Sequence, residues 1–117
     1  MPLFDNTQLA LERAISGAAL RQEVLANNLA NAETPGFRRS DVDFHSQLAQ
    51  AMKSDDHTVI ENAAFSPEQD TQVLRADGNG VDIDVEAANM AKNGLEYDAM
   101  VSVAKARIQI LRAAMGQ

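Results

Sequence analysis

The stretch Leu25–Phe37, LANNLANAETPGF, decides where the first helical segment ends and how the chain turns after it. Leu25, Leu29 and Ala32 keep the four-then-three spacing of a buried helix face. The last four residues, TPGF, end that pattern, because proline followed by glycine suits the two central positions of a type II turn. We therefore expect a helix that stops abruptly at a tight turn.

Three asparagines lie together just before this turn, although each costs roughly 0.5 kcal/mol of helix stability relative to alanine. Asn27 and Asn31 share one helix face, and Asn28 lies at the edge of the apolar stripe. Side-chain amides placed there bridge to backbone groups or to other subunits and fix register, as a polar residue does in a coiled coil. We interpret them as contacts to other chains.

Upstream of the turn, the apolar spacing predicts a helix that begins near Asn6 and runs to Asn31 or Ala32. Asp5 precedes it as the expected N-cap. The pattern is a heptad seam broken once by a polar residue, Gln22. The seam consists of Leu11, Ile15, Ala18, Gln22, Leu25, Leu29 and Ala32.

The last segment, residues 84–117, predicts a second long helix with Asp84 as its cap. Its first stripe consists of Met90, Gly94, Tyr97, Val101, Ala104, Ile108, Leu111 and Met115. Its second stripe consists of Ala99, Val103, Ala106, Ile110 and Ala113. Two stripes make an apolar face wider than one partner helix covers. We expect this face to meet both an intramolecular helix and neighbouring chains.

The middle of the chain, residues 38–83, has weaker patterns. Asp41 is expected to cap a short helix that ends by Lys53, with Phe44, Leu48 and Met52 on one side. Residues 54–70 lack a sustained period and predict a mobile loop. The pieces TQVLRA and VDIDV flank the turn sequence DGNG and are compatible with a β-hairpin.

These patterns predict a mainly α fold in three parts. Residues 1–37 form the first helix and its TPGF turn, residues 38–83 an acidic and partly flexible middle, and residues 84–117 the last helix. The two long helices are expected to pack together as an α-helical coiled coil. Alanine is the dominant apolar residue and only 4% of residues are aromatic, so each helix buries little surface and partners help to complete the packing.

Composition also excludes several classes of function. The net charge is -7, with the excess acid in residues 38–86, which argues against nucleic acid as a partner. The chain has no cysteine, so thiolate chemistry and disulfides are excluded. No apolar run reaches the roughly 18 residues of a membrane span, and the first residues lack the layout of a secretory signal. Work outside the cytoplasm would need a route without a cleaved signal.

Residues for catalysis or metal binding are not evident. The acidic run DGNGVDIDVE fails the EF-hand pattern in either register and suits a turn followed by a helix cap. Neither His45 nor His57 has a second ligand at zinc-like spacing. No nucleophile elbow or phosphate loop is present. We expect no enzyme activity, no cofactor, no metal and no small-molecule substrate.

The stretch that ends the first helix resembles the N-terminal signature of the bacterial flagellar axial proteins, the family of rod, hook and hook-associated proteins. The short chain, the continuation RRSDVDF and the run DGNGVDIDVE are most similar to the proximal rod proteins of the basal body. Two closely related proximal types share these features, and the lack of a longer internal domain favours one of them. The matching residues are Ala26, Asn27, Asn28, Leu29, Ala30, Asn31, Thr34, Pro35, Gly36 and Phe37.

This resemblance implies a structural subunit of the tubular basal-body rod, which spans the periplasm, transmits torque and passes exported subunits. The implied partners are other copies of the chain, other rod proteins, the MS ring with its rod adaptor, and the flagellar type III export apparatus, which needs no cleaved signal peptide. The alternative is a soluble cytoplasmic helical adaptor or regulator that acts through its coiled coil; a cell-wall hydrolase is a distant third. The residues expected to pack the helices are Leu11, Ile15, Ala18, Leu25, Tyr97, Val101, Ala104, Ile108, Leu111, Val103 and Ile110.

Overall fold

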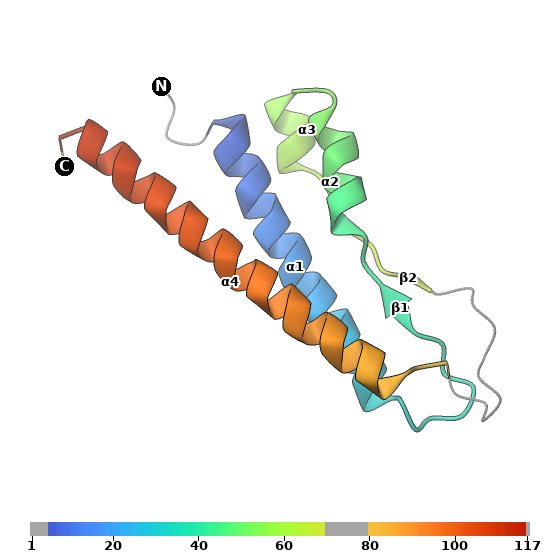
Figure 1. The fold of residues 1–117 in the computed structure, drawn as a ribbon. Coiled ribbons are helices and arrows are strands. Elements are labelled where there is room, and N and C mark those ends of the chain that lie inside the picture. Colours follow the sequence, from blue (N-terminus) through green and yellow to red (C-terminus); the bar gives the residue numbers. More distant parts are fainter. Residues whose placement is uncertain (1–4, 70–79, 117) are drawn as a thin grey trace.

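Two long antiparallel helices dominate the computed structural model, which describes residues 5–69 and 80–116 (Figure 1). Helix α1 spans Asn6–Ala30 and helix α4 spans Ile83–Ala114. Between them lie two short helices, α2 (Phe44–Met52) and α3 (His57–Glu61), and two short strands, β1 (Ser40–Asp41) and β2 (Glu68–Gln69). The mainly α fold with two long terminal helices packed together is confirmed.

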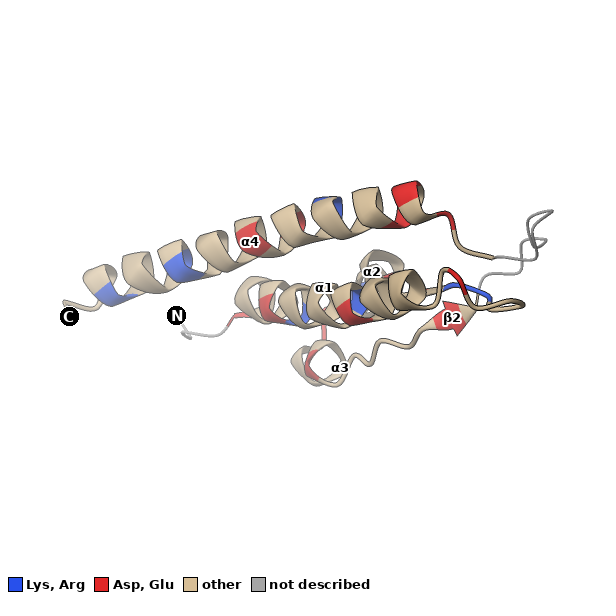
Figure 2. Ribbon diagram, turned by 90° about the horizontal axis from the view of Figure 1, so that it is seen from below, with Lys and Arg blue, Asp and Glu red and all other residues tan. Residues whose placement is uncertain are grey.

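Helix α1 lies in the middle of the molecule. It packs against α4 on one side and against α2 and α3 on the other. Figure 2 accordingly shows α4 as a layer of its own. The molecule is elongated, with principal extents of 61, 26 and 14 Å. Helix α4 therefore has one covered face and a long opposite face without a partner among the described residues.

The first helix begins where the sequence predicts. Asp5 caps α1, and its Oδ1 accepts a hydrogen bond from the Gln8 amide at 2.8 Å. The helix ends at Ala30, slightly earlier than expected, because Asn31 already has the backbone geometry of a C-cap. The TPGF turn is confirmed: the amide of Phe37 donates to the Thr34 carbonyl at 3.2 Å, and Gly36 has a φ of 77°.

The predicted cap of the last helix is wrong by two residues. Asp82 is the N-cap of α4, and its Oδ1 accepts from the amides of Asp84 and Val85 at 3.0 and 3.2 Å. Asp84 instead lies in the first turn, where a negative charge favours the helix dipole. The first predicted stripe does face α1 from Met90 to Leu111. The prediction that Met115 belongs to this stripe is wrong. Met115 is 59% exposed, because it lies beyond the last residue of α4.

Two expectations for the middle of the chain are wrong. Asp43, not Asp41, caps α2 and accepts from the Ser46 amide at 3.3 Å. The predicted loop over residues 54–70 contains α3 and strand β2; α3, at five residues, is too short to show a period.

The predicted hairpin is also corrected. Residues 83–85 of VDIDV form the first turn of α4, and TQVLRA lies outside the described residues. The antiparallel pair that forms instead joins β1 to β2, with Ser40 opposite Gln69 and Asp41 opposite Glu68.

Two small apolar clusters hold the short elements on α1. Leu9 and Ala10 pack with Ile60 of α3, which is only 1% exposed. Ala18 packs with Val42 and Phe44 at the start of α2, and Tyr97 and Met100 of α4 reach the same cluster. Close approach is possible because position 17 is glycine: a Cβ there would lie 2.6 Å from the Phe44 Cβ. Within the described residues, no helix has the length and apolarity needed to cross a membrane.

Candidate functional site

Asn28 is the central residue of the junction between α1, the TPGF turn and α4. Its side chain is fully buried. The Nδ2 atom donates to the Ser40 carbonyl at 2.6 Å and to Glu86 Oε1 at 2.9 Å, and Oδ1 accepts from the Ser40 amide at 3.0 Å. The interpretation of Asn28 as a contact to another chain is therefore wrong, because all of these partners lie within its own chain.

Glu86 is a buried carboxylate at the same junction, with an exposed fraction of 1%. Burying a charge is costly unless it is paired, and Arg39 supplies the pair. The Arg39 Nε and Nη2 atoms each lie 3.0 Å from a carboxylate oxygen of Glu86. This hydrogen bonding raises the pKa of Arg39 above its usual range, outweighing the opposing effect of burial, with a further contribution from Asp41. The first turn of α4 is thus held to the segment that comes after the TPGF turn.

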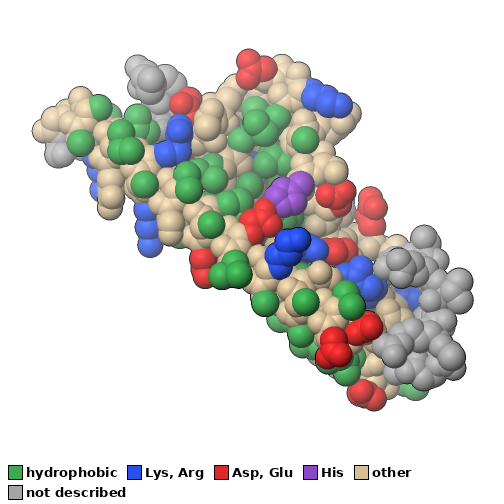
Figure 3. Space-filling view, viewed as in Figure 1, with side chains coloured by type: hydrophobic (Ala, Val, Ile, Leu, Met, Phe, Trp, Pro, Cys, Tyr) green, Lys and Arg blue, Asp and Glu red, His purple; other side chains and the backbone are tan. Residues whose placement is uncertain are grey.

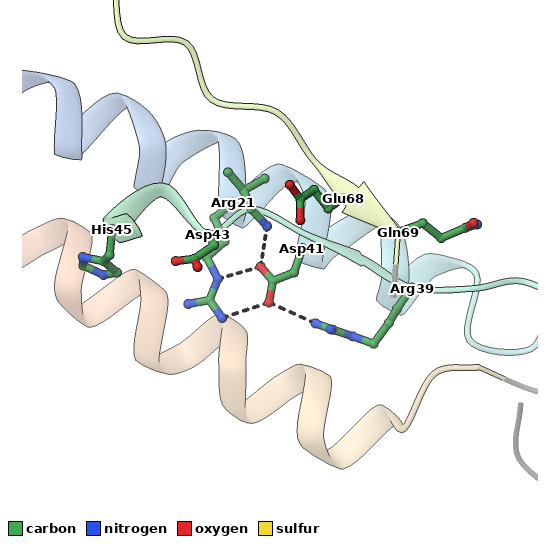
Figure 4. A pocket seen from close by; sticks show the side chains of 8 residues that line it. Arg21, Arg39, Asp41, Asp43, His45, Glu68 and Gln69 are labelled. Carbon is green, nitrogen blue, oxygen red and sulfur yellow. Dashed lines mark hydrogen bonds and ion pairs between the residues drawn. The ribbon is translucent and has the colours of Figure 1, made fainter. Parts of the chain in front are cut away.

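Asp41 extends this network to the middle of α1 (Figure 4). Arg21 approaches it with two nitrogens, Nε at 2.8 Å and Nη2 at 3.2 Å, and Arg39 Nη2 lies 3.3 Å away. Burial acts to raise the pKa of Asp41. The hydrogen bonds and charge of Arg21, the Val42 amide and Arg39 outweigh burial, so the pKa lies below its ordinary value.

The Arg21–Asp41–Arg39 cluster lines an open cavity of about 510 Å³, which Asp43, His45 and Glu68 also border. Asp41 together with Glu86 balances the charges of Arg21 and Arg39, and Arg21 pairs with Asp41, as Arg39 does with Glu86, through two nitrogens. Within the described residues, no three histidine, cysteine, aspartate or glutamate side chains form a group suited to a metal ion. The arrangement fixes the position of three segments and offers no nucleophile activated by a base.

Three pairs of polar side chains cross the interface of α1 and α4, and we call them the polar rungs: Asn28–Glu86, Gln22–Asn93 and Gln8–Arg107. In the middle rung, Asn93 Nδ2 donates to Gln22 Oε1 at 2.8 Å and to the Ala18 carbonyl at 2.9 Å. In the last rung, Arg107 Nε donates to Gln8 Oε1 at 2.9 Å. Polar pairs that are at least partly buried fix the register of two helices, because sliding would leave them unpaired.

Sequence reasoning found this interface only in part. The break in the seam at Gln22 was the visible signal of a polar rung. Gln8, Glu86 and Asn93 are buried but lie outside the predicted stripes, so spacing alone did not indicate them. Only the antiparallel pairing of α1 with α4 brings them opposite their partners.

The remaining assembly-motif residues surround Asn28 at the end of α1. Leu29, Asn31 and Phe37 are half-buried. The Asn31 Nδ2 atom donates to the Asn27 carbonyl at 2.9 Å, so its amide supports the helix end. The exposed members of the motif are Ala26, Asn27, Ala30, Thr34, Pro35 and Gly36.

The predicted helix-packing residues divide into an inner and an outer set. Ala18, Leu25 and Ala104 are buried. The half-buried members are Leu11, Ile15, Tyr97, Val101, Ile108 and Leu111. Val103 and Ile110, which are 51% and 67% exposed, form the outer set.

Val103 and Ile110 belong to a longer exposed row on α4, which we call the outer stripe. Hydrophobic side chains follow α4 along its length in the space-filling view (Figure 3). The spacing of three and four residues is that of a coiled-coil seam. The outer stripe consists of Leu95, Ala99, Val103, Ala106, Ile110 and Ala113.

Comparison with known proteins agrees with this geometry. Residues 9–38, which cover most of α1 and the TPGF turn, match the family model described as flagella basal body rod protein. The chain is 32% identical to the flagellar basal body rod protein FlgB of Proteus mirabilis, over 97% of this chain and 96% of that protein.

Two further relatives show the same extent of similarity. The FlgB of Bacillus subtilis is 32% identical over 98% of this chain and 97% of its own length. The FlgB of Escherichia coli is 34% identical over 92% of this chain and 93% of its own length. Identity at this level along nearly the whole of both chains shows that the chain belongs to the FlgB family of flagellar basal body rod proteins.

Proposed function

We propose that the chain is a structural subunit of the proximal rod that assembles through the outer stripe of α4. The observation that carries this proposal is the division of the α4 surface. Its inner stripe, which is the first predicted stripe from Met90 to Leu111, is buried or half-buried against α1, whereas its outer stripe remains exposed along the helix. An exposed apolar row of this kind on a soluble chain is typical of a protein–protein contact.

We further propose that the neighbours are other copies of the chain, other rod proteins and the MS ring with its rod adaptor. The polar rungs support a role in transmitting torque, because they resist sliding of α1 along α4. The cysteine-free sequence supports passage through the type III export apparatus in unfolded form, because no disulfide must be broken. In this proposal residues 1–37 and 84–117 form the packed shaft and residues 38–83 decorate it.

A deletion strain complemented with this chain tests the proposal. We expect the unmodified chain to restore swimming and to fractionate with the cell envelope. Under the alternative of a helical adaptor, the chain would remain in the cytoplasm and swimming would not depend on it. That result would overturn the proposal.

The role of the outer stripe is tested by placing charge on it. We expect Val103→Glu combined with Ile110→Glu to abolish swimming while the purified chain keeps its helix content, because both side chains are already exposed. Val59→Glu is the matched control, since Val59 is a 43% exposed valine on α3. Normal swimming of the double variant would contradict the role of this stripe.

A further inference from the structure

Gly94 lies in the middle of α4, and neither its φ nor a close neighbour in the described structure requires glycine there. Glycine inside a helix costs up to about 1 kcal/mol relative to alanine. A Cβ added at Gly94 would meet no atom within 4 Å, and its φ is not among the positive values of the chain. Gly17 differs, because Phe44 occupies the space that a Cβ would need. The free space at Gly94 is therefore available to something outside the chain.

This space belongs to a groove between α1 and α4. The groove has a volume of about 330 Å³ and is lined by Ala19, Gln22, Gly94, Tyr97 and Asp98. Ala19 and Gly94 contribute little or no side chain to its lining, which leaves space in the groove. The Gln22 side chain accepts a hydrogen bond from Asn93 Nδ2. The groove can accept one large aliphatic side chain.

The outer stripe provides such a side chain. Leu95 is 72% exposed, the highest value among the large apolar residues described. It lies on a different face of α4 from the groove, so one copy cannot fill its own groove with it. A contact between two different faces of identical chains is heterologous and continues from copy to copy, as a ring or a helical array requires.

Charges around the two surfaces indicate how a second copy would be oriented. Lys92 precedes Leu95 by three residues and lies on the same face; it is exposed and forms no ion pair with the described residues. Glu23 follows Ala19 by four residues on the same face of α1 and is likewise exposed and without an ion pair in the described structure. Because α1 and α4 run antiparallel, Glu23 lies on the side of the groove toward the α4 N-terminus.

We propose that Leu95 of one copy inserts into the Gly94 groove of a second, parallel copy, with Lys92 of the first beside Glu23 of the second. In a parallel copy, Lys92 lies one turn from Leu95 toward the α4 N-terminus, on the side where the groove presents Glu23. In an antiparallel copy, Lys92 would point toward Ser16 instead. The inference rests on the proposed function, because a rod of one polarity needs parallel subunits.

Engineered disulfides test the orientation without background, because the chain contains no cysteine. Two differently tagged copies, one with Lys92→Cys and one with Glu23→Cys, are produced together in a strain that lacks its own protein. We expect a disulfide that links the two tags in isolated basal bodies. A link from Lys92→Cys to Ser16→Cys instead, or no link to either position, would overturn the proposal.

A bulky residue in the groove provides the second test. Gly94→Leu should leave the purified chain folded, with an unchanged or higher melting temperature, but reduce swimming at least tenfold. Gln50→Leu, at an exposed position of α2, is the matched control and should swim normally. Normal swimming with Gly94→Leu would overturn the groove contact while leaving the rod assignment intact. Failure of the unmodified chain to restore swimming would overturn both.

Discussion

At the scale of single residues, Asn28 shows how a polar side chain can be essential to a fold without facing solvent or a partner chain. Its amide uses one acceptor and two donor contacts at once, to the backbone of Ser40 and to Glu86. The sequence shows that asparagines cluster before the TPGF turn. It does not show which of them turns inward, because that depends on where β1 and the first turn of α4 lie.

Replacing Asn28 by alanine is expected to destabilise the chain by about 2–4 kcal/mol, because it removes two hydrogen bonds to the Ser40 backbone and one to the buried Glu86 carboxylate, which keeps Arg39 as a partner. Asn27→Ala is the matched control. Asn27 is exposed, so its replacement should change the free energy of unfolding by less than about 0.5 kcal/mol. Urea unfolding of both variants measures the difference. Equal stabilities would show that the Asn28 contacts contribute nothing.

The two helical glycines should respond in opposite directions to alanine. Gly17→Ala should lower stability by about 1–3 kcal/mol, because its Cβ would lie 2.6 Å from the Phe44 Cβ and force α2 away from α1. Gly94→Ala should raise the stability of the isolated chain by up to about 1 kcal/mol, since nothing occupies the space. Thermal unfolding of the two variants decides this, and a stabilising Gly17→Ala would refute the close approach of α2.

Acid should weaken the chain partly through Asp41. Its pKa is lower in the folded state than in the unfolded chain, where it is about 3.9. The contribution of Asp41 to stability is therefore complete above the unfolded value and is lost as the pH falls through the folded value. Asp41→Asn should flatten the decline in the urea midpoint below about pH 4. Asp98→Asn, at an exposed position without an ion pair in the described structure, should leave that decline unchanged.

At the scale of elements, the spacing of apolar residues predicts the long helices, whereas the helix caps and the short helix α3 depend on features that spacing does not show. The inner stripe of α4 follows the predicted four-and-three spacing because α1 covers it along most of its length. The caps of α2 and α4 lie two residues from the predicted positions, because each helix start has two aspartates that are two residues apart and spacing does not rank them. Helix α3 depends on Ile60 being buried against α1, which a five-residue window does not reveal.

The two candidate caps of α4 are separable by mutation. Asp82→Ala should cost about 1 kcal/mol, because it removes the acceptor for the amides of Asp84 and Val85. Asp84→Ala should cost about 0.3–1 kcal/mol, because it removes only a favourable charge near the helix N-terminus. Chemical denaturation measures the free energy of unfolding of both variants. A larger loss of stability for Asp84→Ala than for Asp82→Ala would indicate that Asp84 is the cap.

At the scale of the whole molecule, the charge distribution and the apolar faces indicate different kinds of contact. Acidic residues gather at the N-terminal end of α4 and basic residues along its C-terminal half (Figure 2). The polar rungs give the helix pair one register, and the outer stripe gives it a surface for neighbours. The two-helix architecture and the family were predictable from the sequence, because both rest on local patterns. The groove at Gly94 was not, because it exists only where two helices meet.

The assignment of this chain as a subunit of the flagellar rod meets its sharpest test in electron microscopy of basal bodies. These are isolated from a strain that lacks its own protein, with and without this chain supplied. We predict MS rings without a rod in the deletion strain and complete rods with attached filaments when the chain is supplied. Intact rods and filaments in the deletion strain would contradict the assignment.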